Sequence, residues 1–124
     1  GLPACLAEVP GLNSGLMIVQ YLSADLLSEI SMLASPITIM NQTMSTGQED
    51  VVSFAPTSNR LLERQLELYK YLLASTLLVT VRASRMANIE VSTAIQEALE
   101  FYLQTDVGGE RSFSDVIEAF ADQL

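Results

Sequence analysis

The residues best suited to chemistry lie together near the middle of the 124-residue chain, in the segment Gly47-Gln48-Glu49-Asp50. One amide and two carboxylates stand here between a stretch without charge, residues 30–48, and an apolar helical pattern. A buried carboxylate costs more to ionise, so it becomes a candidate acid, base or ammonium-binding group. Alternatively, Glu49 and Asp50 only complement the positive end of the following helix. The residue types alone leave both interpretations open.

Composition excludes several other kinds of site. The sequence contains no histidine, which removes the usual acid and base near pH 7 and the commonest metal ligand, and we expect no metal site. Cys5 is the only cysteine; we interpret it as a buried, inert thiol in a protein of the reducing cytoplasm. The segment Gly11-Leu12-Asn13-Ser14-Gly15 lacks the lysine of a phosphate-binding loop and predicts a tight turn before a helix.

The acidic, apolar composition limits the partners. A net charge of −9 argues against nucleic acid and against anionic membranes, which need clustered cations. The chain is 49% hydrophobic and only 17% charged, with a mean hydropathy of +0.31, so part of its apolar surface is expected to meet other polypeptide. We interpret residues 1–124 as one domain or fragment, with bundle helices and a site loop in 1–89 and acidic peripheral helices in 90–124; the resemblance described below implies that it is the C-terminal one.

The spacing of apolar residues predicts an all-α fold, in which two long antiparallel helices of a larger bundle precede two short C-terminal helices. The first long helix is expected to be capped by Asn13 or Ser14 and to end before Pro36. The second is expected to start after Ser53 with Pro56 in its first turn. It should reach about residue 86, helped by ion pairs from Arg64 to Glu67 and from Glu67 to Lys70.

The two short helices are expected to start near residue 92 and at residue 112. The first of them runs from Ser92 or Thr93 to about residue 104. The second follows Gly108-Gly109, because Ser112 and Asp115 have the spacing of a capping box, and it reaches about residue 123. Both have an amphipathic pattern, which places them on the outside of a bundle.

The middle of the second long helix is apolar on nearly every side, since residues 71–81 carry no charge. These eleven residues are too few for the ~20 that span a bilayer. Such a helix belongs inside a bundle, and one other long helix cannot surround it. We therefore expect self-association, with Leu73 and Leu77 buried. The uncharged loop 35–47, rich in methionine and hydroxyl side chains, is likewise expected to be buried in an interface or cavity.

Two motifs in order carry a family resemblance. The first runs from Gly1-Leu2-Pro3 through Pro10-Gly11-Leu12-Asn13-Ser14-Gly15-Leu16-Met17-Ile18, and the second is Ser45-Thr46-Gly47-Gln48-Glu49-Asp50-Val51-Val52-Ser53, with Ser35-Pro36 between them. Over about residues 1–85 the chain resembles the C-terminal part of the aromatic amino acid ammonia-lyases. That family includes histidine, phenylalanine and tyrosine ammonia-lyases and aminomutases.

The resemblance implies a homotetramer built around a helical bundle and a methylidene-imidazolone group made from an internal Ala-Ser-Gly. No Ala-Ser-Gly occurs in this chain, so alone it is expected to be inactive and to need the missing N-terminal polypeptide. By the resemblance, Glu49 would orient the amine of an aromatic amino acid substrate or transfer a proton, and Gln48 would support the prosthetic group. Val51 stands where histidine-type lyases commonly carry histidine. The alternative is a non-enzymatic helical oligomerisation module.

Overall fold

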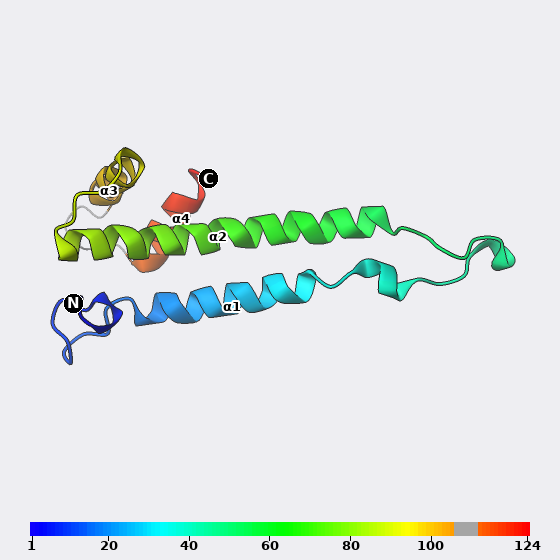
Figure 1. Cartoon of the computed structure of the whole chain (residues 1–124), viewed down its shortest axis with the longest axis horizontal. Coiled ribbons are helices and arrows are strands. Elements are labelled where there is room, and N and C mark those ends of the chain that lie inside the picture. Colours follow the sequence, from blue (N-terminus) through cyan, green and yellow to red (C-terminus); the bar gives the residue numbers. More distant parts are fainter. Residues whose placement is uncertain (106–111) are drawn as a thin grey trace.

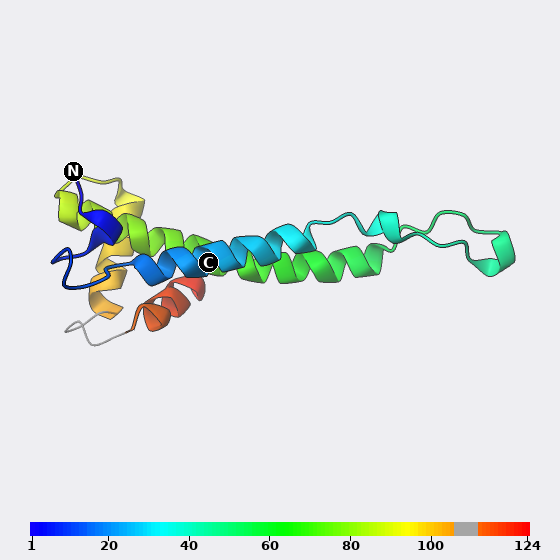
Figure 2. The same ribbon diagram turned by 90° about the horizontal axis from the view of Figure 1, so that it is seen from below.

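The chain forms a helical hairpin with a long loop at one end and two further helices at the other (Figure 1). The computed structural model describes residues 1–105 and 112–124. Helices α1 (Met17–Leu33) and α2 (Ala55–Ala87) run antiparallel and side by side in both views (Figures 1 and 2). No strand occurs among the described residues. The predicted all-α class and the two long helices are confirmed.

Helix α1 ends where the sequence predicts but starts differently. Pro36 has an extended backbone, which stops the helix in the segment just before it. At the other end the predicted caps are wrong, because Leu16 takes the N-cap position and no side chain accepts a hydrogen bond there. Ser14 contributes only its backbone carbonyl, which accepts from the N–H of Met17 at 3.2 Å. Asn13 makes no side-chain cap either.

The N-terminal segment sets the start of α1. The carbonyl of Cys5 accepts a hydrogen bond of 2.7 Å from the N–H of Leu16. Gly15 has a φ of +54°, and a Cβ at this position would collide with the same carbonyl oxygen, so only glycine fits. The expected burial of Cys5 is wrong: its side chain is exposed, because the segment turns the backbone of Cys5 toward the helix.

Helix α2 has the predicted boundaries. Pro56 lies in its first turn, where the missing N–H costs no hydrogen bond. The helix is entered through Phe54 and left through Asn88, both with left-handed backbone, at φ of 48° and 50°. Asn88 is the kind of residue that tolerates this conformation at a helix C-terminus, since its short polar side chain can form local hydrogen bonds.

The two short helices are also where the sequence predicts. Helix α3 is Thr93–Thr105 and α4 is Phe113–Ala121. The capping box of α4 is complete: the Ser112 hydroxyl accepts from the N–H of Asp115 at 3.3 Å, and the Asp115 carboxylate accepts from the N–H of Ser112 at 3.1 Å. The expected separation at Gly108-Gly109 lies outside the described residues.

The main hydrophobic core joins α2 to α4 and to the start of α1. It consists of Leu16, Val19, Ala74, Leu78, Val81, Val116, Ile117, Phe120 and Ala121. A smaller cluster of Leu26, Ile30 and Leu68 holds α1 against the middle of α2. The core therefore lies at the end of the hairpin that is far from the loop, and α4 covers it with an amphipathic face.

Arg82 of α2 ties this end of the molecule together. Its Nε donates a hydrogen bond of 3.1 Å to the carbonyl of Leu6, and its guanidinium lies 5.8 Å from the centre of the Phe113 ring. An ion pair with Glu8, at 3.7 Å, adds a longer contact. Only 16% of the Arg82 side chain is exposed, so one residue links the N-terminal segment, α2 and α4.

The apolar middle of α2 is covered on one side only. Ala74, Leu78 and Val81 are completely buried, whereas 49% of Leu73 remains exposed. Leu77 is half-buried against the main core. The expectation that Leu73 is enclosed is thus not met within one chain, because α1 and α4 occupy only two faces of α2. Among the described residues, no helix is both long and apolar enough to cross a membrane.

Candidate functional site

The candidate site lies in the loop between the two long helices, residues 34–54, which extends well past the ends of both (Figures 1 and 2). Two short 3-10 turns interrupt it, at Ile37–Met40 and Ser45–Gly47. Its apolar side chains are open to solvent in the single chain: 70% of Ile39 and 79% of Val51 are exposed. The single chain therefore leaves the uncharged loop exposed, and the burial of this loop in an interface stays a prediction.

Backbone hydrogen bonds shape the tip of the loop. Met44 and Glu49 form an antiparallel bridge, with N–H to carbonyl distances of 2.9 and 3.2 Å. Between them the chain turns through Ser45, Thr46 and Gly47, all with positive φ. A further hydrogen bond of 3.2 Å joins the N–H of Gln48 to the carbonyl of Ser45. Gln48 and Glu49 are thus presented on a closed turn rather than on a loose strand.

The base of the loop is held by one side chain. The side chain of Asn41 accepts a hydrogen bond of 3.1 Å from the N–H of Val52. This bond joins the segment that leaves α1 to the segment that returns to α2. Beside this contact lies an open cavity of about 290 Å³, with the lining residues Ile37, Met40, Gln42, Met44, Phe54 and Thr57. The cavity has no charged lining side chain, so nothing in it balances an acid or a base.

The structure places Gln48, Glu49 and Asp50 together at the tip, and all three are exposed. Neither carboxylate lies in the first turn of α2, where no acidic residue is found. The simpler interpretation, that Glu49 and Asp50 complement the positive end of that helix, therefore has little geometric support, since the dipole acts within the first turn. Nor do other polar groups of the described residues converge on Glu49.

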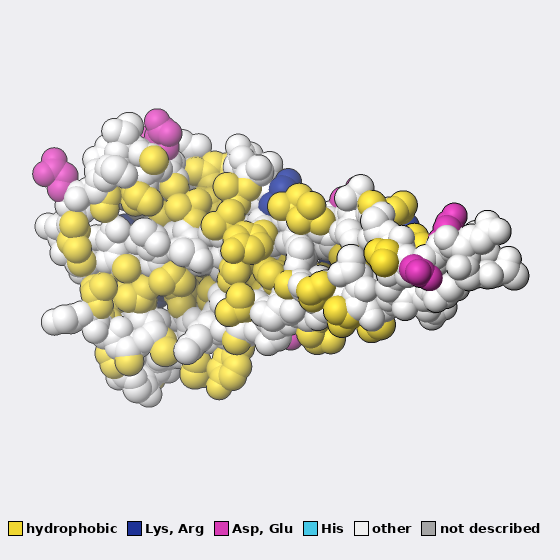
Figure 3. All heavy atoms as spheres, turned by 45° about the vertical axis from the view of Figure 1, so that its right-hand side comes forward, with side chains coloured by type: hydrophobic (Ala, Val, Ile, Leu, Met, Phe, Trp, Pro, Cys, Tyr) yellow, Lys and Arg dark blue, Asp and Glu magenta, His cyan; other side chains and the backbone are white. Residues whose placement is uncertain are grey.

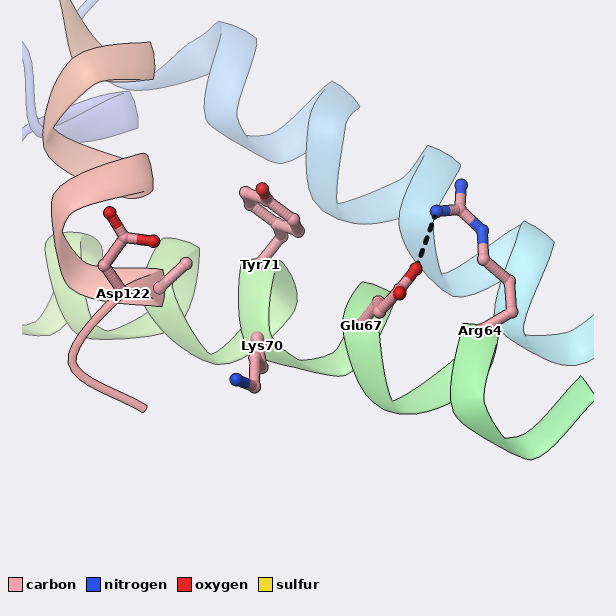
Figure 4. A pocket seen from close by; sticks show the side chains of 6 residues that line it. Arg64, Glu67, Lys70, Tyr71 and Asp122 are labelled. Carbon is pink, nitrogen blue, oxygen red and sulfur yellow. Dashed lines mark hydrogen bonds and ion pairs between the residues drawn. The ribbon is translucent and has the colours of Figure 1, made fainter. Parts of the chain in front are cut away.

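A second cavity, of about 430 Å³, lies between α2 and the end of α4 (Figure 4). Arg64 beside it binds Glu29 of α1 at 3.1 Å and Glu67 at 3.3 Å. The hydrogen bonds that Arg64 donates to the carboxylate of Glu29, and then to that of Glu67, raise the pKa of Arg64 above its ordinary value. The pairing of Arg64 with Glu67 was predictable from their i,i+3 spacing, whereas Glu29 is 35 residues away. Since these side chains are solvent-exposed, the cluster is a surface brace between the helices.

The remaining sequence motif has a structural role. Residues 9–13 form a turn in which the Val9 carbonyl accepts hydrogen bonds of 3.0 and 3.2 Å from the N–H groups of Leu12 and Asn13. The turn leads into α1 through Gly15 and holds no lysine, as expected for a helix entry. Among the described residues, no cluster of three or more potential metal ligands occurs.

Comparison of the sequence with known proteins identifies a matching family. The model of the aromatic amino acid lyase family matches residues 1–104, and so extends beyond the span of about 85 residues that the motifs indicate. Histidine ammonia-lyase of Geobacillus kaustophilus is 35% identical over the whole of this chain, and that of Staphylococcus aureus is 34% identical over 99% of it. No solved structure gives a significant match.

The chain spans about a quarter of the length of these curated relatives. Both the helical hairpin and the loop that carries Gln48 and Glu49 lie inside the matched region, since the family model covers residues 1–104. The same is true of both motifs on which the resemblance depends. The chain belongs to the aromatic amino acid lyase family.

Proposed function

We propose that this chain is the C-terminal portion of an aromatic amino acid ammonia-lyase or aminomutase, and that it supplies bundle helices and one wall of the active site. The observation that carries the proposal is the placement of Gln48 and Glu49 on a closed turn at the tip of a projecting loop. Family membership and the similarity to histidine ammonia-lyases support it. A wall that projects needs other polypeptide to complete the site.

The chemistry available at the tip is that of one carboxylate and one amide. Glu49 can accept a hydrogen bond from a substrate ammonium, or take up a proton from it, once the tip is enclosed. Gln48 can donate and accept hydrogen bonds and so hold neighbouring polar groups in place. Methylidene-imidazolone would supply the electrophile. Because this chain has no Ala-Ser-Gly, we assign that group to another part of the protein and the chain alone no turnover.

The substrate class follows from the family rather than from the loop. We propose an aromatic amino acid and leave elimination and amine migration as equal possibilities for the complete enzyme. Val51, next to the acidic pair, offers only an aliphatic surface, so it cannot contact a polar substrate side chain. We further propose that the complete protein is a cytoplasmic homotetramer, in which copies of these apolar helices associate with one another.

The test is an assay of the complete enzyme, that is, the gene product that includes the polypeptide upstream of residue 1. Histidine, phenylalanine and tyrosine are supplied in turn, and ammonia and aryl acrylate absorbance are followed, together with any β-amino acid formed. We expect Glu49→Gln to lower kcat by about 10²-fold or more, the scale of a lost proton-transfer group, with unchanged assembly.

Asp50→Asn is the matched control, since it removes a neighbouring charge from the same turn and should keep most of the activity. Unchanged kinetics for Glu49→Gln would show that Glu49 is a solvated surface residue without a catalytic role. If the complete protein released no ammonia and formed no β-amino acid from any of the three substrates, the non-enzymatic oligomerisation module would be the better assignment.

A further inference from the structure

The tip of the loop 34–54 has no packed core of its own. None of residues 41–52 is buried in the single chain, and 79% of Val51 is exposed. On the face that Figure 3 displays, hydrophobic side chains gather over the helical body and become fewer toward the projecting end, where acidic side chains stand out. Since burial contributes little there, the conformation that presents Glu49 depends on hydrogen bonds within the loop.

The turn before Glu49 is unfavourable on its own. Ser45 and Thr46 have φ of +52° and +55°, in the left-handed region that residues other than glycine rarely adopt, and Thr46 is β-branched. A single antiparallel bridge, between Met44 and Glu49, closes the turn. Such a backbone conformation persists only where the surrounding structure determines it. The turn therefore needs support from residues outside it.

Asn41 is placed to supply this support. Its backbone is extended, and its side chain accepts the hydrogen bond of 3.1 Å from the N–H of Val52. Asn41 lies three residues before Met44, and its partner lies three residues after Glu49. The two pairs therefore belong to one antiparallel register. Among the described residues of the loop 34–54, no other side chain forms a hydrogen bond.

The register decides on which face of the loop Glu49 lies. Gln42 and Met44, two residues apart, both line the open cavity beside the loop, as expected of an extended segment whose alternate side chains share a face. Residues directly opposite each other in an antiparallel bridge have their side chains on the same face, so Glu49 lies on the face of Met44. A slip of one residue would put Asp50 in this place and turn Glu49 to the opposite face.

We infer that Asn41 is a positioning residue for Glu49: by binding the N–H of Val52, it fixes the register in which the turn presents the Glu49 carboxylate. The inference rests on the proposed function, in which Glu49 meets the substrate ammonium. Asn41 itself touches no reacting atom and acts only through the backbone. Because a proton-transfer group works only within hydrogen-bond reach of its proton, a displaced Glu49 loses its effect.

The test is a double-mutant cycle in the complete enzyme, with the polypeptide upstream of residue 1 included. We expect Asn41→Ala to lower kcat about tenfold, because Glu49 is no longer held in its productive position. In a Glu49→Gln background, the same substitution should lower kcat by less than about twofold, since no proton-transfer group is left to position. A residue that only stabilised the loop would cost the same factor in both backgrounds.

Two further variants separate the hydrogen bond from the side chain as such. Asn41→Asp keeps an oxygen acceptor at the same distance from the backbone and should return kcat to within about threefold of the wild-type value. Thr43→Ala is the matched control, since Thr43 is exposed in the same segment and makes no hydrogen bond through its side chain. It should leave kcat within about twofold of the wild-type value. No recovery in Asn41→Asp would contradict the role given to the acceptor.

Amide hydrogen exchange of the same proteins measures the register without catalysis. Asn41→Ala should make exchange over residues 44–52 several-fold faster and leave the helices unchanged. Unchanged exchange there, or equal losses of kcat in the two backgrounds, would overturn the inference while the proposed function stands. If the complete wild-type protein turned over none of the three substrates, the proposed function would fail and the catalytic role of Asn41 with it. Exchange would still decide whether Asn41 fixes the turn.

Discussion

The two halves of α2 differ in how far their apolar side chains are buried. The C-terminal half is enclosed by the N-terminal segment and α4, and Leu78 and Val81 there are completely buried. The N-terminal half meets α1 on one side only and leaves Leu62 and Leu66 more than half exposed. One end of the hairpin therefore encloses a core, while the other end and its loop leave large apolar side chains exposed in the single chain.

The difference also appears in the polar contacts. At the closed end, only 16% of the Arg82 side chain is exposed, and it bridges three segments. At the open end, Arg64 and its partners Glu29 and Glu67 are about half exposed. The same residue type is a structural link in the first environment and a solvated brace in the second, and substitutions should separate the two roles.

The largest difference is expected for buried leucine. Leu78→Ala removes a side chain with no exposed surface and should lower the free energy of unfolding by about 2–5 kcal/mol, from lost transfer energy and the cavity left behind. Leu27→Ala in α1, where 53% of the side chain is exposed, should cost less than about 1 kcal/mol. Urea unfolding of the dilute chain measures both. Equal losses would mean that the two ends do not differ as described.

The next largest effect is expected at the contact between the N-terminal segment and the start of α1. Gly15→Ala places a methyl group against the Cys5 carbonyl at a positive φ, and about 1–3 kcal/mol of stability should be lost from backbone strain alone. Gly11→Ala is the matched control, because it also has a positive φ but open space around it. A larger loss at Gly11 than at Gly15, in the same urea experiment, would contradict the role given to the contact.

Arginine substitutions sharpen the comparison further. Arg82→Met keeps an apolar stem but removes the hydrogen bond to the Leu6 carbonyl and the contact with Phe113, so a loss of about 1.5–3 kcal/mol is expected. Arg64→Met breaks two exposed ion pairs and should change the unfolding midpoint much less. Raising the salt concentration should reduce the Arg64 effect and leave most of the Arg82 effect. If the loss of stability in Arg82→Met depended strongly on salt, the Arg82 side chain would have to be exposed to solvent.

Local signals were sufficient to predict the helices but not their partners. Pro36, Pro56 and the Ser112–Asp115 capping box mark helix ends through their own backbone chemistry, so these boundaries agree with the structure. The start of α1 was missed because a carbonyl eleven residues earlier, that of Cys5, binds Leu16. A backbone hydrogen bond between distant residues produces no characteristic spacing of residue types, so the sequence does not predict it.

Where a helix carries no charged residue and is apolar on nearly every side, periodicity cannot distinguish its buried face from its exposed face. In residues 71–81 the sequence could not say that Ala74 and Leu78 face the core while Leu73 faces solvent. The candidate site was partly predictable: Gln48 and Glu49 stand out because they follow a long stretch, residues 30–48, that carries no charge. Their position at the outermost turn depends on backbone bonds between Met44 and Glu49, which the residue types do not reveal.

The smallest global effect, and the most local one, is expected at the base of the loop. Asn41→Ala removes the acceptor that holds the N–H of Val52 at 3.1 Å, but no core residue contacts this pair. The urea midpoint should stay within error, because the loop is not part of the cooperative core. Cleavage of the loop by a protease of broad specificity should become several-fold faster, with Gln42→Ala as the neighbouring control. A lowered urea midpoint would instead show that the loop and the helical core unfold together, and the contrast between the two ends would have to be abandoned.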